Sequence, residues 1–293
     1  MNLSSEEKMI DQLPLEETAF PVGAARPVAG TLLRLRPLWS TLDQVCEVMR
    51  VPLPERHGRC DVLFQHLRFK PGQRLNVTGS AFGRLYLVRG GFLKTVMIDD
   101  CGSEQVLGFP MRGDVLGIDG ISEKRHTAET VCLTDCDLIA MPFHQIIAIE
   151  QEVPGMQDMM CSVISRELAR DQKMIGMLST YSAEARVARF LVNLSERYAA
   201  LGFSAHDFTL QMTRRDIGSY LGLTLETISR TLNAFKNLQF IDLAARKIQI
   251  KDEAALRHLR RFAPNSLNHR RAMRHIGDLG PSETASMAQR QWL

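Results

Sequence analysis

The fold of this chain is constrained most by residues 212–235, which read MTRRDIGSYLGLTLETISRTLNAF. Thr213, followed three residues later by Asp216, has the pattern of a capping box, so a helix is predicted to begin here. Gly222 is predicted to end that helix, because glycine readily takes the left-handed conformation just past a helix end. Thr224 then has the residue type and position of a second cap. The segment therefore predicts two short amphipathic helices joined by a tight turn.

The two predicted helices each have an apolar and a polar face. The spacing predicts burial of Ile217, Tyr220 and Leu221 in the first helix, and of Leu225, Ile228, Leu232 and Phe235 in the second. Glu226, Ser229 and Arg230 stay on the open face of the second helix. Arginine can bind guanine through two hydrogen bonds, and glutamate accepts one from cytosine N4. The pattern indicates a DNA recognition helix, and an ordinary helical hairpin with a solvated face is the alternative.

Charge is concentrated around these helices rather than spread over the chain. Residues 212–251 contain seven Lys or Arg residues and three acidic residues, whereas the net charge of all 293 residues is only +3. A local basic excess is what the neutralisation of phosphates requires. Contacts to phosphates would position the second helix without reading sequence, and we expect them from Thr213, Arg214, Thr224 and Lys236.

The hydrophobic pattern divides the chain into five segments and predicts an α+β fold. Short apolar runs alternate with Gly and Asp turns over residues 56–150, which predicts an antiparallel β-barrel or jelly roll. The other segments are a partly disordered N-terminal lead at 1–55 with a short helix in 40–49, a long helix in 151–181 beginning at Pro154, a winged helix-turn-helix at 182–260, and a basic, disordered tail at 261–293. Strands are expected at 74–77, 85–91 with its turn, 92–98, 105–109, 127–132 and 137–141; a helix is expected at 183–200, and wing strands at 240–243 and 247–251.

The long helix carries an apolar seam with the spacing of a coiled coil. The seam begins near Cys161, and we expect a dimer interface along Ile164, Leu168, Asp171, Ile175 and Leu178. Asp171 is the exception, because a carboxylate on a two-fold axis would face its own copy and is costly to bury. The alternative is a helix packed on its own barrel, with Asp171 at the rim.

Composition excludes several other classes of protein. No run approaches the roughly 18 apolar residues of a membrane span, and the acidic start MNLSSEEKMIDQL has no apolar core of a secretion signal, which predicts a cytoplasmic protein. The six cysteines form no CxxC pair, so we expect buried thiols rather than disulfides or a metal site. A nucleophile elbow, a phosphate loop and an HExxH motif are all missing from the sequence, so an enzyme is not expected.

The order of β-roll, long helix and winged helix-turn-helix resembles that of the CRP/FNR family of bacterial transcription regulators, over residues 60–258. The recognition helix is similar to that of the FNR branch, which carries E-x-x-S-R; the CRP branch carries R-E-x-x-x-R, and Leu225 replaces its first arginine. The resemblance implies that Glu226, Ser229 and Arg230 read bases, in a homodimer on the palindrome TTGAT, four bases, ATCAA. RNA polymerase would be a further partner, and Asp171 looks like the acid that opposes association in that branch.

The effector sites of the family match less well. Cyclic-AMP-binding members carry G-E-L and R-S-A segments, where this chain has Gly117-Ile118-Asp119 and His126-Thr127-Ala128, so the ribose acid and the phosphate arginine are missing; His126 is expected at the surface. Of the four FNR cysteines that hold an iron–sulfur cluster, only Cys46 falls near a counterpart, and Ile139 stands near the position of the fourth. Two alternatives stay open: a cyclic-nucleotide-binding module that regulates a partner, and a redox sensor whose cluster uses an irregular set, with roles for Cys60, Cys132 and Cys136.

Overall fold

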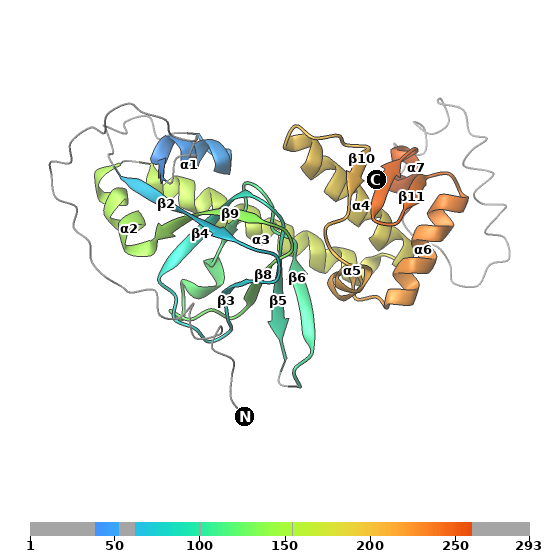
Figure 1. Cartoon of the computed structure of the whole chain (residues 1–293), viewed down its shortest axis with the longest axis horizontal. Coiled ribbons are helices and arrows are strands. Elements are labelled where there is room, and N and C mark those ends of the chain that lie inside the picture. Colours follow the sequence, from blue (N-terminus) through green and yellow to red (C-terminus); the bar gives the residue numbers. More distant parts are fainter. Residues whose placement is uncertain (1–38, 53–61, 100, 154, 260–293) are drawn as a thin grey trace, which may run out of the picture. The chain divides into compact units, whose positions relative to one another are not determined.

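The computed structural model describes residues 39–52, 62–99, 101–153 and 155–259 (Figure 1). The expected tail at 261–293, Cys60, and residues 1–38 and 53–55 of the expected N-terminal lead lie outside these ranges. The described residues form an antiparallel β-roll, a long helix and a C-terminal helix-turn-helix with a small sheet, in that order. The predicted α+β class and its antiparallel roll are confirmed.

Two antiparallel sheets make up the β-roll. One has the strand order β1-β2-β9-β4-β7, and the other has the order β3-β8-β5-β6. Their strands are β1 (Trp39–Thr41), β2 (Leu63–Phe69), β3 (Arg74–Asn76), β4 (Arg84–Gly90), β5 (Leu93–Ile98), β6 (Glu104–Gly108), β7 (Val115–Leu116), β8 (Glu129–Cys132) and β9 (Cys136–Pro142). Val88 and Leu138 of the first sheet and Leu93 of the second are fully buried in one cluster that joins the two sheets.

Some elements of the roll were not expected from the sequence. Helix α1 (Leu42–Met49) matches the expected short helix, and a capping box between Thr41 and Gln44 starts it. Strand β1 pairs with β2, so residues 39–49 belong to the roll rather than to a separate lead. β2 and β7 were also missed, because β2 does not alternate regularly between apolar and polar residues and β7 has only two residues.

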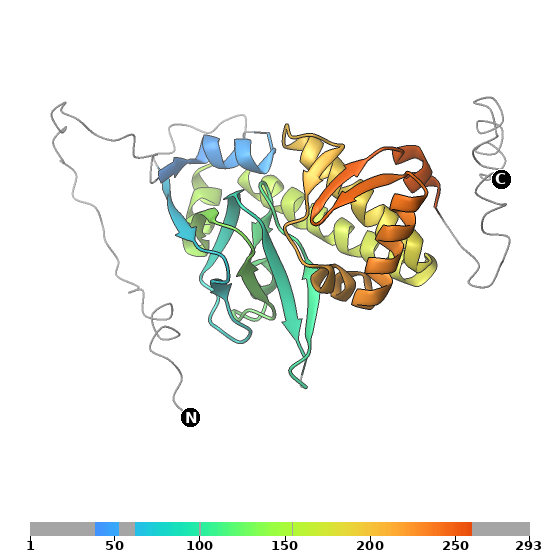
Figure 2. The same ribbon diagram turned by 45° about the vertical axis from the view of Figure 1, so that its right-hand side comes forward.

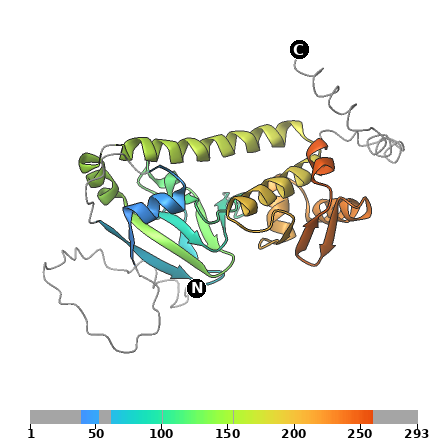
Figure 3. The same ribbon diagram turned by 90° about the horizontal axis from the view of Figure 1, so that it is seen from above.

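Three helices follow the roll. Helix α2 (Phe143–Glu152) was not predicted, whereas α3 (Met156–Thr180) and α4 (Ala183–Ala200) agree with the expected long helix and the helix after it. Figure 3 shows α3 as one unbroken helix. Ser182 separates α3 from α4 and caps the latter by accepting from the Ala185 N–H. Within the described ranges, no helix has both the length and the hydropathy needed to span a membrane.

The C-terminal region contains the predicted winged helix-turn-helix. Its helices are α5 (Arg214–Leu221), α6 (Leu225–Asn237) and α7 (Glu253–His258), and Figure 2 shows α5 and α6 in orange. The wing strands β11 (Ile241–Ala244) and β12 (Lys247–Ile250) pair as expected, and β10 (Asp207–Thr209) adds a third strand in the order β10-β12-β11. α4, α5 and α6 share one hydrophobic core with this sheet, which fixes the orientation of α6.

Candidate nucleic-acid interface

The ends of the two short helices are fixed by the contacts that the sequence predicted. Asp216 accepts from the Thr213 N–H at 2.9 Å, and the Thr213 hydroxyl oxygen accepts from the Asp216 N–H at 3.1 Å, which completes the capping box. Gly222 follows α5 with φ +63°, the left-handed conformation that favours glycine. Thr224 caps α6 by accepting from the Thr227 N–H at 3.2 Å. The turn and both caps are therefore confirmed.

A second glycine of this motif was missed. A Cβ on Gly218 would lie 2.6 Å from the carbonyl oxygen of Leu223, a backbone atom that cannot swing away. The Leu223 N–H donates to the Gly218 carbonyl at 2.8 Å, so the turn folds directly back on α5 at this position. The signal in the sequence was a glycine inside a helical pattern, which implies a close backbone approach when it is needed.

The buried face of α6 agrees with the prediction in all but one residue. Ile228, Leu232 and Phe235 are buried, and Thr231 is buried with them. Leu225 is 41% exposed, so its predicted burial was wrong. Leu225 is the first residue of α6, directly after the cap, and the core does not extend to it.

The three expected base-reading residues lie on one face of α6, because positions 229 and 230 follow position 226 by three and four residues of helix. Glu226 and Arg230 are exposed, and Ser229 is half-buried. The Ser229 hydroxyl accepts from Arg214 Nη1 at 3.2 Å, and Arg230 Nη2 donates to Thr227 Oγ1 at 3.4 Å. α5 and α6 thus present one continuous polar face, and Thr227 holds Arg230 against the helix.

The environment of Glu226 favours its charged form. The pKa of this carboxyl is lowered by a hydrogen bond from its own backbone N–H at the helix start and by one from the Thr224 hydroxyl, with a smaller contribution from the positive charge of Arg215. A free N–H group at a helix N-terminus stabilises negative charge in this way. Glu226 is therefore an acceptor at neutral pH, as a contact with cytosine N4 requires.

The side chains of the four residues expected to contact phosphates already form hydrogen bonds within the protein. Lys236 donates to the Leu243 carbonyl at 3.2 Å and so ties α6 to β11 of the wing. Both donors of Thr213, its backbone N–H and its hydroxyl, are bound to Asp216, so a phosphate would have to replace one of these bonds. The Thr224 hydroxyl caps α6, and Arg214 is bound to Ser229. All four residues lie at the first or last turn of α5 or α6, and their contact with phosphates stays a prediction.

The seam of α3 is exposed in the single chain. Ile164, Leu168 and Ile175 are exposed, the last by 67%, and Asp171 is exposed beside them; Leu178 is partly buried. The N-terminal turns of α3 do pack on the roll, since Met156, Met159 and Val163 are buried. The helix thus has one end on its own roll and a long apolar stripe without a described partner.

The region that resembles the cyclic-nucleotide segments is occupied by the chain itself. The Asp119 carboxylate accepts from the backbone N–H groups of Thr127 at 2.8 Å and Ala128 at 3.2 Å, and lies 3.5 Å from His126 Nδ1. Burial would raise the pKa of Asp119, but His126 and these N–H groups outweigh it and lower the pKa. His126 is 6% exposed, so its predicted surface position was wrong; its ring packs edge-on against Phe82. A phosphate placed here would face a carboxylate, so these residues do not fit a cyclic nucleotide.

The cysteines of the described residues are dispersed. Cys46 is buried beside Met159, 3.5 Å between the sulfur atoms, and burial raises the pKa of its thiol to about 11. Cys132 and Cys136 are buried in a different core cluster, and Cys101 and Cys161 are exposed. Within the described part of the chain, no group of three or more His, Cys, Asp or Glu side chains could hold a metal ion. Cys46 and the Cys132–Cys136 pair therefore do not fit a shared iron–sulfur site.

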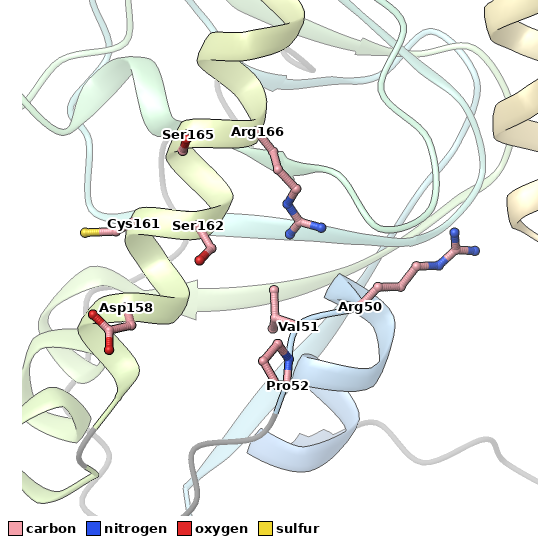
Figure 4. A pocket seen from close by; sticks show the side chains of 8 residues that line it. All are labelled: Arg50, Val51, Pro52, Asp158, Cys161, Ser162, Ser165 and Arg166. Carbon is pink, nitrogen blue, oxygen red and sulfur yellow. The ribbon is translucent and has the colours of Figure 1, made fainter.

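An open hollow of about 730 Å³ lies between the end of α1 and the N-terminal half of α3 (Figure 4). Arg166 points across it from α3 and donates through both terminal nitrogens to the Met49 carbonyl, at 3.1 and 3.2 Å. Arg50, on the other side, donates to the Ala200 carbonyl. Both guanidinium groups are thus used to join helices, and Arg166 in particular fixes α1 to α3.

Known proteins match both the roll and the helix-turn-helix. A family model described as a Crp-like helix-turn-helix domain matches residues 185–259, and one described as a cyclic nucleotide-binding domain matches residues 66–152. The fumarate and nitrate reduction regulatory protein of Escherichia coli (strain K12) is 38% identical over 75% of this chain and 88% of its own length. The chain belongs to the CRP/FNR family of transcription regulators.

Two further relatives agree with this assignment. The transcriptional regulatory protein btr of Bordetella pertussis (strain Tohama I) is 34% identical over 74% of this chain and 90% of its own. Among solved structures, FixK2 from Bradyrhizobium japonicum has a TM-score of 0.63 at 24% identity, covering 69% of this chain and all of that one, which shows the shared fold. This CRP/FNR protein is therefore a helix-turn-helix transcription regulator with a roll of the cyclic-nucleotide-binding fold, and its Escherichia coli and Bordetella pertussis relatives are both regulatory proteins.

Proposed function

We propose that this CRP/FNR regulator binds a palindromic DNA operator as a homodimer, with α6 of each chain in a major groove. The observation that carries the proposal is the polar face of α6, where Glu226, Ser229 and Arg230 stand side by side on a helix capped at its start and packed on its opposite face. A helix held so firmly loses little freedom when it enters a groove. The expected operator is TTGAT, four bases, ATCAA.

In this proposal each contact has a separate role. Arg230 binds a guanine through two hydrogen bonds, Glu226 accepts from a cytosine, and Ser229 contacts a neighbouring base. Thr213, Arg214, Thr224 and Lys236 bind phosphates and fix the register of the helix on the duplex. The contact between Arg214 and Ser229 supports this division, because it places a cation of α5 directly beside the base-reading set.

Dimerisation through α3 would supply the two-fold symmetry of the operator. The exposed residues Ile164, Leu168 and Ile175 form an apolar stripe that a second copy of α3 would cover, with Asp171 opposed to its own copy. Two recognition helices about one helical turn apart would then read two half-sites. We further propose that the protein acts in the cytoplasm and that its partner there, besides DNA, is RNA polymerase.

The operator and the dimer are tested together with the full-length chain. Fluorescence anisotropy compares a labelled duplex carrying the palindrome with one in which six bases separate the same half-sites, and sedimentation gives the number of chains per duplex. We expect tight binding only at the four-base spacing, with two chains on each duplex, because a changed spacing rotates one half-site away from its helix. Equal affinity for both duplexes, or one chain per duplex, would overturn the proposal.

A further inference from the structure

A strand at the edge of the roll is bound to the first helix of the helix-turn-helix. β6 ends the sheet order β3-β8-β5-β6, so its outer side pairs with none of the described strands. On that side the Val106 N–H donates to the Ser219 hydroxyl oxygen at 2.8 Å, and this hydroxyl donates to the Glu104 carbonyl at 3.2 Å. One serine of α5 thus satisfies backbone groups that an edge strand otherwise offers to water or to another chain.

An ion pair lies beside these hydrogen bonds. Lys94 Nζ of β5 is 3.0 Å from Asp216 Oδ1 of α5 and 3.4 Å from Glu104 Oε2 of β6. The side chains of Lys94 and Asp216 are only 17% and 11% exposed, so salt screens their attraction less than that of a surface pair. Burial would lower the pKa of Lys94, but its bonds with Asp216 and Glu104 outweigh this and raise it. Lys94 is therefore a charged link between β5 and α5.

The ion pair between β5 and α5 can separate without leaving either charge unpaired. If α5 moved away, Lys94 would keep Glu104, and Asp216 would keep the N–H and hydroxyl of Thr213. The backbone N–H and C=O groups of β6 would then form hydrogen bonds with water, which costs little net free energy compared with leaving them without a partner. Neither side would retain a buried charge without a partner, which is the usual obstacle to separating an ion pair.

A second contact divides in the same manner. The Asp114 carboxylate, in the turn before β7, accepts from Arg197 of α4 and from Arg170 of α3. Arg170 lies 2.6 Å from Asp114 and also 2.6 Å from Glu167. When Arg197 leaves with α4, Asp114 keeps Arg170. Asp114 therefore stays paired after release, and the partly exposed Arg197 would bind water. The roll also holds α4 and α5 by apolar packing, because Val96, Val106 and Phe109 lie in their hydrophobic core, and release would expose these side chains.

We propose that the β5–β6 hairpin is an autoinhibitory clamp on α5, and this rests on the proposed function. The first helix of a helix-turn-helix lies across the DNA backbone when the second helix enters the groove. The clamp holds Asp216, which bonds to Thr213 at the start of α5, and brings the carboxylate of Glu104 to the same place. A hairpin there competes with phosphates for α5 and adds negative charge, so DNA binding requires its release.

Two substitutions outside the expected DNA contacts test the clamp in the full-length chain. Ser219→Ala removes the two hydroxyl bonds to β6 and leaves the bond from Gln105 Nε2 to the carbonyl oxygen of residue 219. Lys94→Gln removes the ion pair. Each should tighten binding to the palindromic duplex roughly three- to tenfold, because a lost contact shifts the population toward the released state. Loss of a positive charge alone weakens DNA binding, so tightening by Lys94→Gln cannot come from charge. Lys70→Gln is the matched control, because Lys70 Nζ forms an ion pair with Asp135 Oδ1 at 3.1 Å on the surface of the same roll. This variant loses the same charge and should not tighten DNA binding.

Hydrogen exchange gives a second measurement. A contact with a purely structural role would leave the exchange rate of the Val106 amide unchanged when DNA binds. The Val106 amide should exchange slowly in the free protein and faster once the operator is bound, and Ser219→Ala should speed it without DNA. The clamp alone would be overturned if the wild-type protein selects the operator and both variants bind it no more tightly than the wild type does. A Val106 amide that stays protected from exchange in the operator complex would also overturn it. Wild type and variants that all fail to select the operator would overturn the proposed function and the clamp together.

Discussion

Among single residues, Arg230 and its neighbours on α6 carry the proposed reading of bases. Arg230 lies on the exposed face and is held by Thr227 Oγ1 at 3.4 Å, a weak bond that a guanine would replace. Lys236, near the end of the same helix, donates to the wing instead. The two cations are therefore expected to act differently, although both lie on α6.

Arg230→Ala should weaken binding to the operator by roughly 1–3 kcal/mol and relax the preference at one guanine, because a bidentate base contact is lost. Lys236→Ala serves as the comparison and should weaken binding about equally on all sequences, lowering the salt dependence by roughly one charge. Anisotropy titrations on operators with single base changes measure both effects. An Arg230→Ala protein with unchanged affinity and unchanged base preference would show that this residue does not read DNA.

Gly218 allows a prediction about folding that is independent of DNA. Gly218→Ala should lower the free energy of unfolding by roughly 1–3 kcal/mol, because its Cβ would press on the Leu223 carbonyl at 2.6 Å. Gly176→Ala in α3 is the control: nothing lies within 4 Å of its Cβ, and alanine favours helix by about 1 kcal/mol. Thermal unfolding followed by circular dichroism compares them. If both variants were stabilised, the close approach at Gly218 would not constrain the turn.

At the scale of elements, the sequence predicted α3, α4, α5 and α6 well because each has a regular apolar spacing, and three of them begin at a residue whose side chain caps the helix. Strands were predicted where glycine turns bounded them, as for β4 and β5. Strand β2 and helix α2 were missed because neither has a clear period, and both are held by packing on the roll. Asp119 and His126 could not be paired from the sequence, since the bond between them depends on how two loops meet.

The seam of α3 gives the prediction at this scale. Asp171→Ala should strengthen dimerisation and make DNA binding less dependent on any effector, because two carboxylates that meet across the seam repel one another. Sedimentation equilibrium measures the dimer constant of wild type and variant. Gln172→Ala controls for helix propensity, since Gln172 is the exposed neighbour of Asp171 on the same helix. If Asp171→Ala dimerises with the same affinity as the wild type or more weakly, Asp171 does not oppose its own copy in a dimer interface.

Over the whole molecule, three features of the chain combine. The roll pairs its Asp119 carboxylate with the N–H groups of a neighbouring loop, α3 leaves an apolar stripe open, and α6 presents a polar face. The four long or capped helices α3 to α6 and the strands bounded by glycine turns follow from local patterns in the sequence. The contacts between β6 and α5 do not, because Ser219 and Val106 are far apart in sequence and neither has an unusual residue type.

An unbiased selection of DNA by the purified full-length protein tests the proposed operator and the homodimer together. Random duplexes that bind are recovered over several rounds and sequenced. We expect one two-fold symmetric motif, with half-sites about one helical turn apart and TTGAT or a close variant in each, because two copies of α6 read the duplex in the same way. Selection of a single unsymmetric half-site, or enrichment of no sequence at all, would contradict this expectation.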